Sequence, residues 1–356
     1  LDGRIRHLLS GTSRNVNIVI GNGMSLNDDY GYVIPWLQSQ GFICNPLFIE
    51  DPAFANELEK CTGPLLVLGD IEIKIEQAIA IENYILNEKG SALLAISPYV
   101  TDIENNWYIT KAKRTNLVEL AEHWGITFEN EIAADISCSR ITMYADDNNQ
   151  TTLLNYPLWI SLLPQENSPL GMTLFWATPL TFTDDNKNIK PYLITSPAAY
   201  SYEIDNQSPE KLIETNPFVL ENRSLETSTH SRGSIILGAE ITGPLSGLYN
   251  FSQTQNSHVI IISDQYFVNS LMTGYIGGDT GDYRNFEFLT NVLLKLNGEE
   301  ELAALQSRTN RDTSLYKITD AHHFNTLRLI TFIILFIVIP FVILATGVIL
   351  NVKKDR

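Results

Sequence analysis

The sequence predicts an α/β protein with a mainly parallel sheet flanked by helices, a β-rich insertion and one C-terminal transmembrane helix. Three observations predict this architecture. Short apolar runs alternate with helical patterns over residues 1–135, short β-like pieces separated by polar turns fill 136–232, and a long uncharged apolar run lies at 329–350.

Four apolar runs of strand length are expected to form the first strands of the sheet. Three of them end at turns rich in glycine, serine or proline, which stop a strand. The runs are Val16–Ile20, Ile43–Ile49, Leu65–Leu68 and Ala92–Ile96, and the three turns are Gly21-Asn22-Gly23, Gly69-Asp70 and Ser97-Pro98.

Helical patterns separate these runs, at roughly 30–40, 73–88 and 114–124. In the second pattern, five apolar residues share one face, which Glu82 interrupts. Pro35 is expected to bend the first helix or to mark its start. Because strand and helix alternate, the sheet is expected to be parallel and of the glutamine amidotransferase-like or flavodoxin-like type.

The patterns also divide the remainder of the chain. The stretch 136–232 indicates a β-rich insertion or subdomain, with strand-like pieces at 158–163, 172–182 and 192–195. Residues 233–297 return to the α/β core that 1–135 begin, through a buried strand at Val259–Ile262 and a helix at about 283–296. A polar linker follows at 298–326.

The apolar run Leu329–Leu350 predicts a membrane span at 327–352. It contains no charged residue, and a helix of this length measures about 33 Å, enough to cross a bilayer. A buried soluble helix is the alternative. Since Lys353, Lys354 and Arg356 follow, the tail 353–356 is expected to be cytoplasmic and the large domain extracytoplasmic, anchored in the inner (cytoplasmic) membrane.

Charge and cysteine content exclude several classes of protein. The net charge of -17 argues against nucleic acid as a partner, because phosphates require a basic surface. Cys44, Cys61 and Cys138 are scattered and form no disulfide framework or metal motif. The chain opens at Leu1 without a secretory signal, and we expect a further N-terminal portion before it.

Several segments, in order along the chain, resemble GldG-type auxiliary proteins of ABC transporters, which are named for gliding motility and share an intraflagellar-transport-like α/β domain. Each segment is similar to one element of that family: a strand with a glycine turn, a strand-helix-turn-strand unit, a leucine-rich helix ending in WGI, a strand with G/S-D-x-x-F, and an F-x-F-L-x-N helix. In this sequence they are 19–23, 64–98, 116–126, 261–269 and 286–296.

The resemblance implies a non-enzymatic auxiliary subunit that needs no cofactor. Its implied partners are an ABC transporter permease, through it a separate ATPase subunit, and the lipid bilayer. Asn22 and Ser263 depart from the family's residues without breaking a strand or a turn. The chain has no GxxxxGK[ST] motif, so it is not itself the ATPase. A structural envelope component is an alternative that differs only in its partner.

A membrane-tethered hydrolase of amidotransferase-like fold is the alternative from a different class. Its nucleophile is expected at Ser97, on the turn from Ala95 to Tyr99. That turn lacks flanking glycines, and Pro98 removes a backbone N–H that an oxyanion hole needs. The turn Gly21-Asn22-Gly23 also lacks the third glycine of a dinucleotide fingerprint. We therefore assign no catalytic, cofactor or metal residue.

Ligands of open α/β sheets bind beyond the carboxyl ends of the strands, so the turns there are candidate loops that face a ligand or a partner. The acidic loop at 273–282 fits no known calcium-binding spacing, and a solvated turn is expected there. In the membrane helix, small or helix-bending residues are expected to pack against the permease. The candidate loop residues are Asn22, Asp70, Ser97, Asp264 and Asp282, and the packing residues are Pro340, Ala345 and Gly347.

Overall fold

The computed structural model describes most of residues 14–309. Its gaps are 88–89, 104–106, 112–114, 145–150, 169–170, 183–187, most of 204–232, 251 and 278–282, and beyond 309 it describes only Phe332, Phe336, Ile339 and Pro340. The chain divides into two units, Leu1–Arg311 and Asp312–Arg356. The first unit holds the sheet and its helices.

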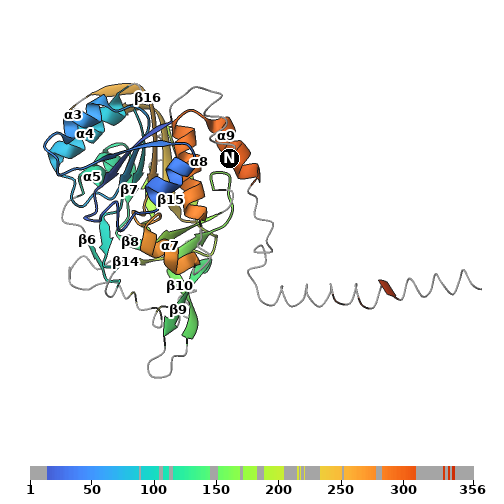
Figure 1. Ribbon diagram of the computed structural model, residues 1–356. Coiled ribbons are helices and arrows are strands. Elements are labelled where there is room, and N and C mark those ends of the chain that lie inside the picture. The colour runs from blue at the N-terminus through green and yellow to red at the C-terminus, as the bar shows by residue number, and fades with distance from the viewer. Residues whose placement is uncertain are drawn as a thin grey trace, which may run out of the picture. The chain divides into compact units, whose positions relative to one another are not determined.

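Five parallel strands form the centre of this unit (Figure 1). In the sheet they lie in the order β2-β1-β3-β4-β16, and every neighbouring pair is parallel. This confirms the prediction that the five apolar runs share one sheet. The strands are β1 (Asn15–Ile20), β2 (Ile43–Leu47), β3 (Leu65–Leu68), β4 (Ser91–Ala95) and β16 (Gln253–Ile262).

Antiparallel strands extend the sheet beyond β16. The long strand β15 (Ile236–Ser246) pairs with β16, and β12 (Leu180–Phe182), β13 (Ile189–Ile194) and β7 (Ile126–Phe128) follow from it. Two strands of the stretch 136–232, β12 and β13, therefore belong to the central sheet. The division of the chain into domains at 135 and 232 stays a prediction.

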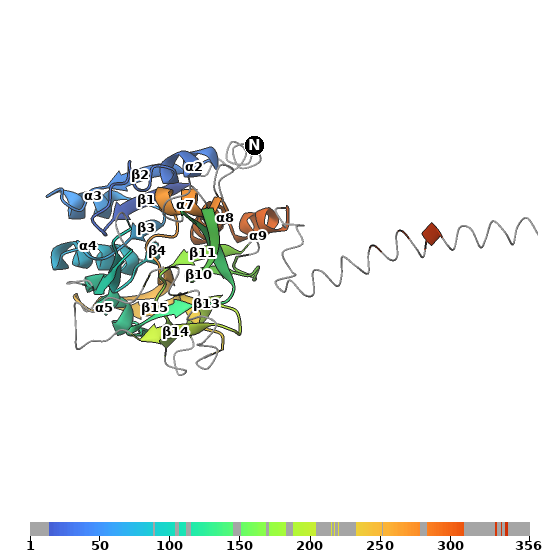
Figure 2. The ribbon, with the colours of Figure 1, turned by 90° about the horizontal axis from the view of Figure 1, so that it is seen from below.

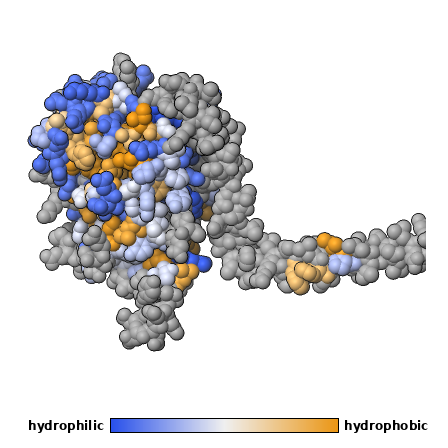
Figure 3. Space-filling model, in the orientation of Figure 1, coloured by the Kyte–Doolittle hydropathy of each residue, from blue (hydrophilic) through white to orange (hydrophobic). Residues whose placement is uncertain are grey.

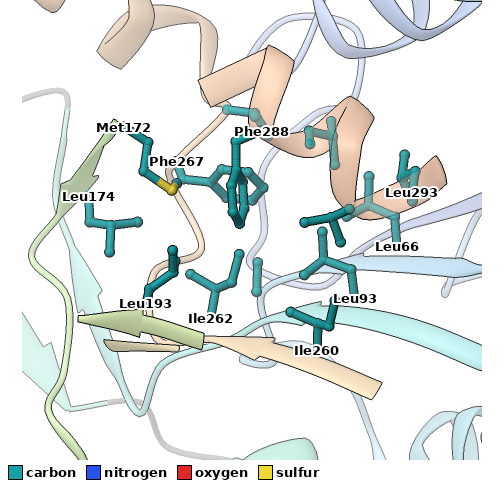
Figure 4. Packing of buried hydrophobic residues seen from close by; sticks show 14 of the residues in the cluster. Leu66, Leu93, Met172, Leu174, Leu193, Ile260, Ile262, Phe267, Phe288 and Leu293 are labelled. Atoms are coloured by element: carbon teal, nitrogen blue, oxygen red, sulfur yellow. The ribbon is translucent and has the colours of Figure 1, made fainter. Parts of the chain in front are cut away.

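Helices cover both faces of the sheet (Figures 1 and 2). The side chains of α2 (Val33–Ser39) and α8 (Arg284–Leu296) pack with Leu66, Leu93 and Ile260 in one buried cluster. Those of α3 (Phe54–Lys60), α4 (Ile75–Leu86) and α5 (Asn116–His123) pack with the opposite face in another. Figure 4 shows Phe288 and Leu293 of α8 directed onto the first face.

The predicted helices are present, with shorter bounds. Pro35 lies in the first turn of α2. Backbone N–H groups in this turn have no acceptor within the helix, so the N–H that proline lacks costs no helical hydrogen bond. The short helix α3 was not predicted, because its seven residues, FANELEK, include only two that are buried, Phe54 and Leu58. A stretch this short carries little periodic signal.

Glu82 lies on the apolar face of α4, where its carboxylate binds the turn between β15 and β16 through hydrogen bonds. The side chain is fully buried. It accepts hydrogen bonds from the backbone N–H groups of Leu248, Tyr249 and Asn250, the last two at 3.1–3.2 Å. Successive N–H groups of this kind form a concave anion site, which here is filled from within the protein.

Smaller sheets lie beside the central one. A three-stranded sheet combines β9 (Cys138–Tyr144), β10 (Thr151–Leu162) and β11 (Met172–Phe175). Two antiparallel pairs combine β8 (Glu131–Ala134) with β14 (Tyr200–Glu203), and β5 (Tyr99–Thr101) with β6 (Ile109–Lys111). Two further helices are α7 (Ser270–Gly277) and α9 (Glu300–Thr309). The prediction of a solvated turn at 273–282 is thus wrong for residues 273–277, which belong to α7.

In the described part of the chain, no helix is long and apolar enough to cross a bilayer. The predicted span at 327–352 falls outside the described residues except for Phe332, Phe336, Ile339 and Pro340. Phe332 and Phe336 stack with ring centroids 4.7 Å apart, and both are exposed. On the face of the molecule drawn in Figure 3, hydrophilic and hydrophobic described residues are intermixed.

Candidate functional site

The carboxyl ends of β1, β3, β4 and β16 lie at one edge of the sheet, because these strands are parallel. Four of the five predicted loop residues follow these strands directly. Their exposed fractions decide what they can do: Asn22 is 8% exposed, Asp70 0%, Ser97 4% and Asp264 1%. The edge is therefore closed at these residues, and each side chain has a partner inside the protein.

Asp264 links the end of β16 to Phe175, the last residue of β11. Its two carboxylate oxygens accept hydrogen bonds from the backbone N–H groups of Phe175, at 2.8 Å, and Tyr266, at 2.6 Å. Burial raises the pKa of Asp264 to about 8, although these hydrogen bonds oppose the rise. The residue links two segments that lie 89 positions apart in the sequence.

Asp70 caps a helix from outside that helix. Its carboxylate accepts hydrogen bonds from the backbone N–H groups of Leu117 and Val118, in the first turn of α5, at 2.9–3.0 Å. These N–H groups have no partner within the helix, and a carboxylate there interacts favourably with the helix dipole. Burial nevertheless raises the pKa of Asp70 to about 7.

Asn22 forms a buried chain of hydrogen bonds with Tyr30 and the turn after β16. Its amide Nδ2 donates to the Tyr30 hydroxyl at 2.7 Å, and that hydroxyl donates to the Gln265 carbonyl at 2.8 Å. Burial raises the pKa of Tyr30 well above its usual value, so the hydroxyl keeps its proton. The chain holds the glycine turn after β1 against β16.

Gln265 is another polar side chain at this edge, and the sequence analysis did not name it. Its amide Nε2 donates to the Tyr99 carbonyl and the Tyr266 hydroxyl, at 3.0 and 3.2 Å. Its Oε1 is buried and accepts no hydrogen bond within the described part of the chain. A Cβ atom at Gly69, whose φ is +91°, would come within 2.3 Å of the Asn22 Cβ and 2.7 Å of this oxygen, so only glycine fits at this position.

Ser97 lies in a turn, and its hydrogen-bond partners are not groups that activate a nucleophilic serine. Its Oγ lies 3.1 Å from the Thr178 Oγ1 and accepts a hydrogen bond from the Tyr99 backbone N–H. Neither partner is a general base, which an activated serine requires. The geometry at the described residues thus gives no support to the hydrolase alternative.

The remaining candidate residues cannot be placed. Asp282, Ala345 and Gly347 lie outside the described residues, and Pro340 is described only as an exposed residue of the second unit. Within the described ranges, no group of three or more His, Cys, Asp or Glu side chains is arranged to hold a metal ion. At the four described candidate residues, the polar side chains are bonded to other groups of the protein.

The comparison with family models agrees with the sequence resemblance at a coarser level. A family model described as "ABC-type uncharacterized transport system" matches residues 13–292, which include the central sheet, helices α2 to α7 and most of α8. A search of curated proteins gives no match. Among solved structures, the chain is similar to the mmIFT52 N-terminal domain, with 12% identity, a TM-score of 0.44, and coverage of 79% of this chain and 96% of that one.

Proposed function

We propose that this chain, which belongs to the family described as "ABC-type uncharacterized transport system", is a non-enzymatic, membrane-anchored and extracytoplasmic subunit that acts by binding a partner or a ligand. Family membership makes it an auxiliary component of an ABC-type transport system. The gliding-motility type, the single C-terminal anchor, and the permease and ATPase as partners are parts of the proposal. The inner (cytoplasmic) membrane is its proposed location.

One structural observation carries the non-enzymatic part of the proposal. At the edge where α/β proteins bind substrates, Asp70, Asp264 and Asn22 are buried and bonded to neighbouring protein groups. An enzyme of this fold places its reactive groups at that edge, within reach of substrate. A subunit that acts through its surface has no such need, and the polar groups can close the edge.

The anchor is proposed to meet the permease through the small residues of its apolar run. Replacing Gly347 by leucine is expected to lower the amount of permease that co-purifies with the chain by roughly fivefold or more, because close helix packing in a bilayer depends on small side chains. The measurement is affinity purification from membranes, followed by mass spectrometry of the bound subunits.

Two matched variants control this experiment. Ile349→Leu changes the same apolar run without adding bulk, and Ser97→Ala removes the hydroxyl of the candidate nucleophile. Both variants are expected to co-purify the permease at the wild-type level. Ser97→Ala is also expected to complement a deletion strain fully. Loss of complementation by a folded, membrane-bound Ser97→Ala protein would replace this proposal with the hydrolase alternative.

The proposed orientation gives a second prediction. A cysteine introduced at the exposed position Asp28 is expected to react with a membrane-impermeant maleimide in intact cells whose outer barrier is permeable to the reagent, while one at Asp355 is expected to react only after lysis. The background is set by a variant in which Cys44, Cys61 and Cys138 are serine. Labelling at position 355 in intact cells, with protection at position 28, would show that the chain has the opposite orientation to the one proposed.

A further inference from the structure

Arg14 and Glu299 form an ion pair at the amino end of the central sheet. The guanidinium Nε and Nη2 of Arg14 donate to the two carboxylate oxygens of Glu299, at 2.5 and 2.6 Å. The side chain of Arg14 is 2% exposed and that of Glu299 is 26% exposed. Bidentate pairs of this kind are among the strong hydrogen bonds of proteins. This one joins residues that lie 285 positions apart in the sequence.

Each partner is fixed to a different part of the domain. Arg14 directly precedes β1, and its carbonyl accepts a hydrogen bond from the Ile43 N–H at the start of β2, at 2.8 Å. Glu299 lies between α8 and α9. The end of α8 is itself bonded to the sheet, since the Ser91 hydroxyl at the start of β4 donates to the Leu296 carbonyl, at 3.2 Å. The pair therefore links the amino end of the sheet to the junction of α8 and α9.

The backbone of this junction gives Glu299 a place in both helices. Gly298 ends α8 in the left-handed conformation, with a φ of 78°. The N–H of Gly298 donates to the Lys295 carbonyl at 3.0 Å and that of Glu299 to the Leu294 carbonyl at 2.9 Å, the two bonds of a Schellman motif. The carbonyl of Glu299 then accepts the first hydrogen bonds of α9. The ion pair thus holds the residue at which α9 begins.

The side chains of α9 add little apolar contact with the domain. Among those that the structure describes, Leu302 is buried and Ala303 partly buried, whereas Glu300, Glu301 and Ala304 are exposed. Figures 1 and 2 show α9 beside α8, which buries residues along most of its length. Elements with few buried apolar contacts open at a lower free energy than the core around them. The attachment of α9 is therefore expected to depend strongly on the ion pair.

We propose that Arg14 and Glu299 form a clasp whose opening releases α9 from the domain while the sheet and α8 stay folded. α9 ends at Thr309, shortly before the first unit ends at Arg311, so its release lengthens the chain that leads from the sheet to the second unit. The ten residues of α9 rise about 15 Å as a helix and span up to about 35 Å when extended. This inference goes beyond the proposed function, because it concerns how the domain is attached and not what it binds.

A permanent structural pair is the alternative to a clasp. Removing Glu299 leaves the charge of Arg14 buried and unpaired, which is strongly destabilising. If the pair is part of the folding core, this cost falls on the whole domain, because Arg14 adjoins β1. If the pair is a clasp, the cost falls on α9 alone. The two cases differ in which backbone amides lose protection against hydrogen exchange.

Hydrogen exchange of the full chain, purified in detergent, tests the proposal. In the wild type, the amides of α9 are expected to exchange roughly tenfold or more faster than those of β3 and β4, because α9 opens locally. Glu299→Gln is expected to speed exchange in α9 by a further factor of roughly ten or more, with β3 and β4 changed less than about twofold. Glu301→Gln removes an exposed carboxylate from the first turn of the same helix and is the matched control, with α9 changed less than about twofold.

Two further variants assign the effect to the pair. Arg14→Lys keeps the charge but cannot donate in the bidentate geometry, and it is expected to speed exchange in α9 roughly threefold or more. This milder change serves if Glu299→Gln does not fold. In the double variant Arg14→Gln/Glu299→Gln neither charge remains unpaired, so its effect on α9 is expected to be smaller than the product of the two single effects.

A distance measurement separates release of α9 from fraying in place. Nitroxide labels are attached to cysteines at the exposed positions Ala55 in α3 and Glu301 in α9, in a chain whose three native cysteines are serine. Electron-electron resonance is expected to give one narrow distance distribution with the clasp intact. With Glu299→Gln, a second population is expected that is displaced by roughly 10 Å or more, because a released α9 can move by its own length.

Four results would overturn the proposal: unchanged exchange of α9 in both Glu299→Gln and Arg14→Lys, exchange in β3 and β4 accelerated as much as in α9, single effects that multiply in the double variant, or a distance distribution that Glu299→Gln leaves unchanged. Because these measurements need neither the permease nor a bilayer, they are independent of the co-purification experiment. Failure of the proposed transport role would leave them unaffected.

Discussion

Replacing Asp264 by alanine is expected to lower the free energy of unfolding by roughly 2–6 kcal/mol, because two buried N–H donors then lose their acceptor at about 1–3 kcal/mol each. Those donors are the backbone groups of Phe175 and Tyr266. Asp264 is 1% exposed, so water cannot replace the carboxylate without a rearrangement of the edge. Denaturant unfolding followed by circular dichroism measures the change.

Asp28→Ala is the matched control for this experiment. Asp28 is an exposed aspartate, and its removal is expected to change stability by no more than about 0.5 kcal/mol, as is usual for surface substitutions. A loss below about 1 kcal/mol in Asp264→Ala would show that Asp264 is not a structural link. The ligand-facing role that its position in the sequence suggested would then regain support.

The parallel part of the central sheet could be predicted because most of its strands contain short, continuous apolar runs. Residues of β3 and β4 are buried without exception, and such a run has few alternatives to a buried strand. The pattern of β15 is weaker. Its eleven residues include Gly238, Glu240, Gly243 and Pro244, which break the apolar alternation, so its place beside β16 is set by pairing and not by local composition.

The carboxyl edge was located from the sequence, but its chemistry was not. Turns after parallel strands must meet at one edge, which brought Asn22, Asp70, Ser97 and Asp264 together. Whether such residues face a ligand or the protein depends on segments far away in the chain. Backbone N–H groups of α5 bond to Asp70, and an N–H group at the end of β11 bonds to Asp264. No local pattern contains that information.

The sequence analysis also missed a cluster of aromatic rings around Trp159, for the same reason. Trp107, Trp159 and Tyr275 lie in three separate elements, and an isolated aromatic residue in a sequence usually belongs to a core. Their common location follows from the packing of the β9–β10–β11 sheet and α7 against the loop after β5. The left-handed backbone of Trp107 and Trp176 has no signature in sequence at all.

Stability is expected to fall as the pH rises from about 5 to 8. Burial raises the pKa of Asp70 to about 7 and that of Asp264 to about 8, from ordinary values of 3.8. Between the ordinary pKa and the raised pKa of each residue, the carboxyl group is protonated in the folded protein and ionised in the unfolded chain. The free energy of unfolding therefore falls as the pH rises. Each carboxyl contributes up to about 1.4 kcal/mol per pH unit over its own range.

The pH dependence that Asp70 and Asp264 cause has the opposite sign to that of a carboxylate in an ion pair, such as Glu240. Although burial opposes it, hydrogen bonds from His258 and Lys295 lower the pKa of Glu240 to about 2, so its contribution is lost only as the pH falls below about 4. In the window from pH 5 to 8 the effect of Asp70 and Asp264 is therefore separable from that of Glu240. Unfolding in urea at half-unit pH intervals measures the slope.

Asp70→Asn and Asp264→Asn test the assignment, since asparagine keeps the shape of the side chain and does not titrate. Each variant is expected to be less stable than the wild type at pH 5, where an amide must place its NH₂ group near an N–H donor, and to lose stability less steeply towards pH 8. The double variant is expected to show the flattest profile. A wild-type stability that is constant or rises from pH 5 to 8 would mean that both carboxylates are ionised in the folded protein, held by their backbone hydrogen bonds in spite of burial.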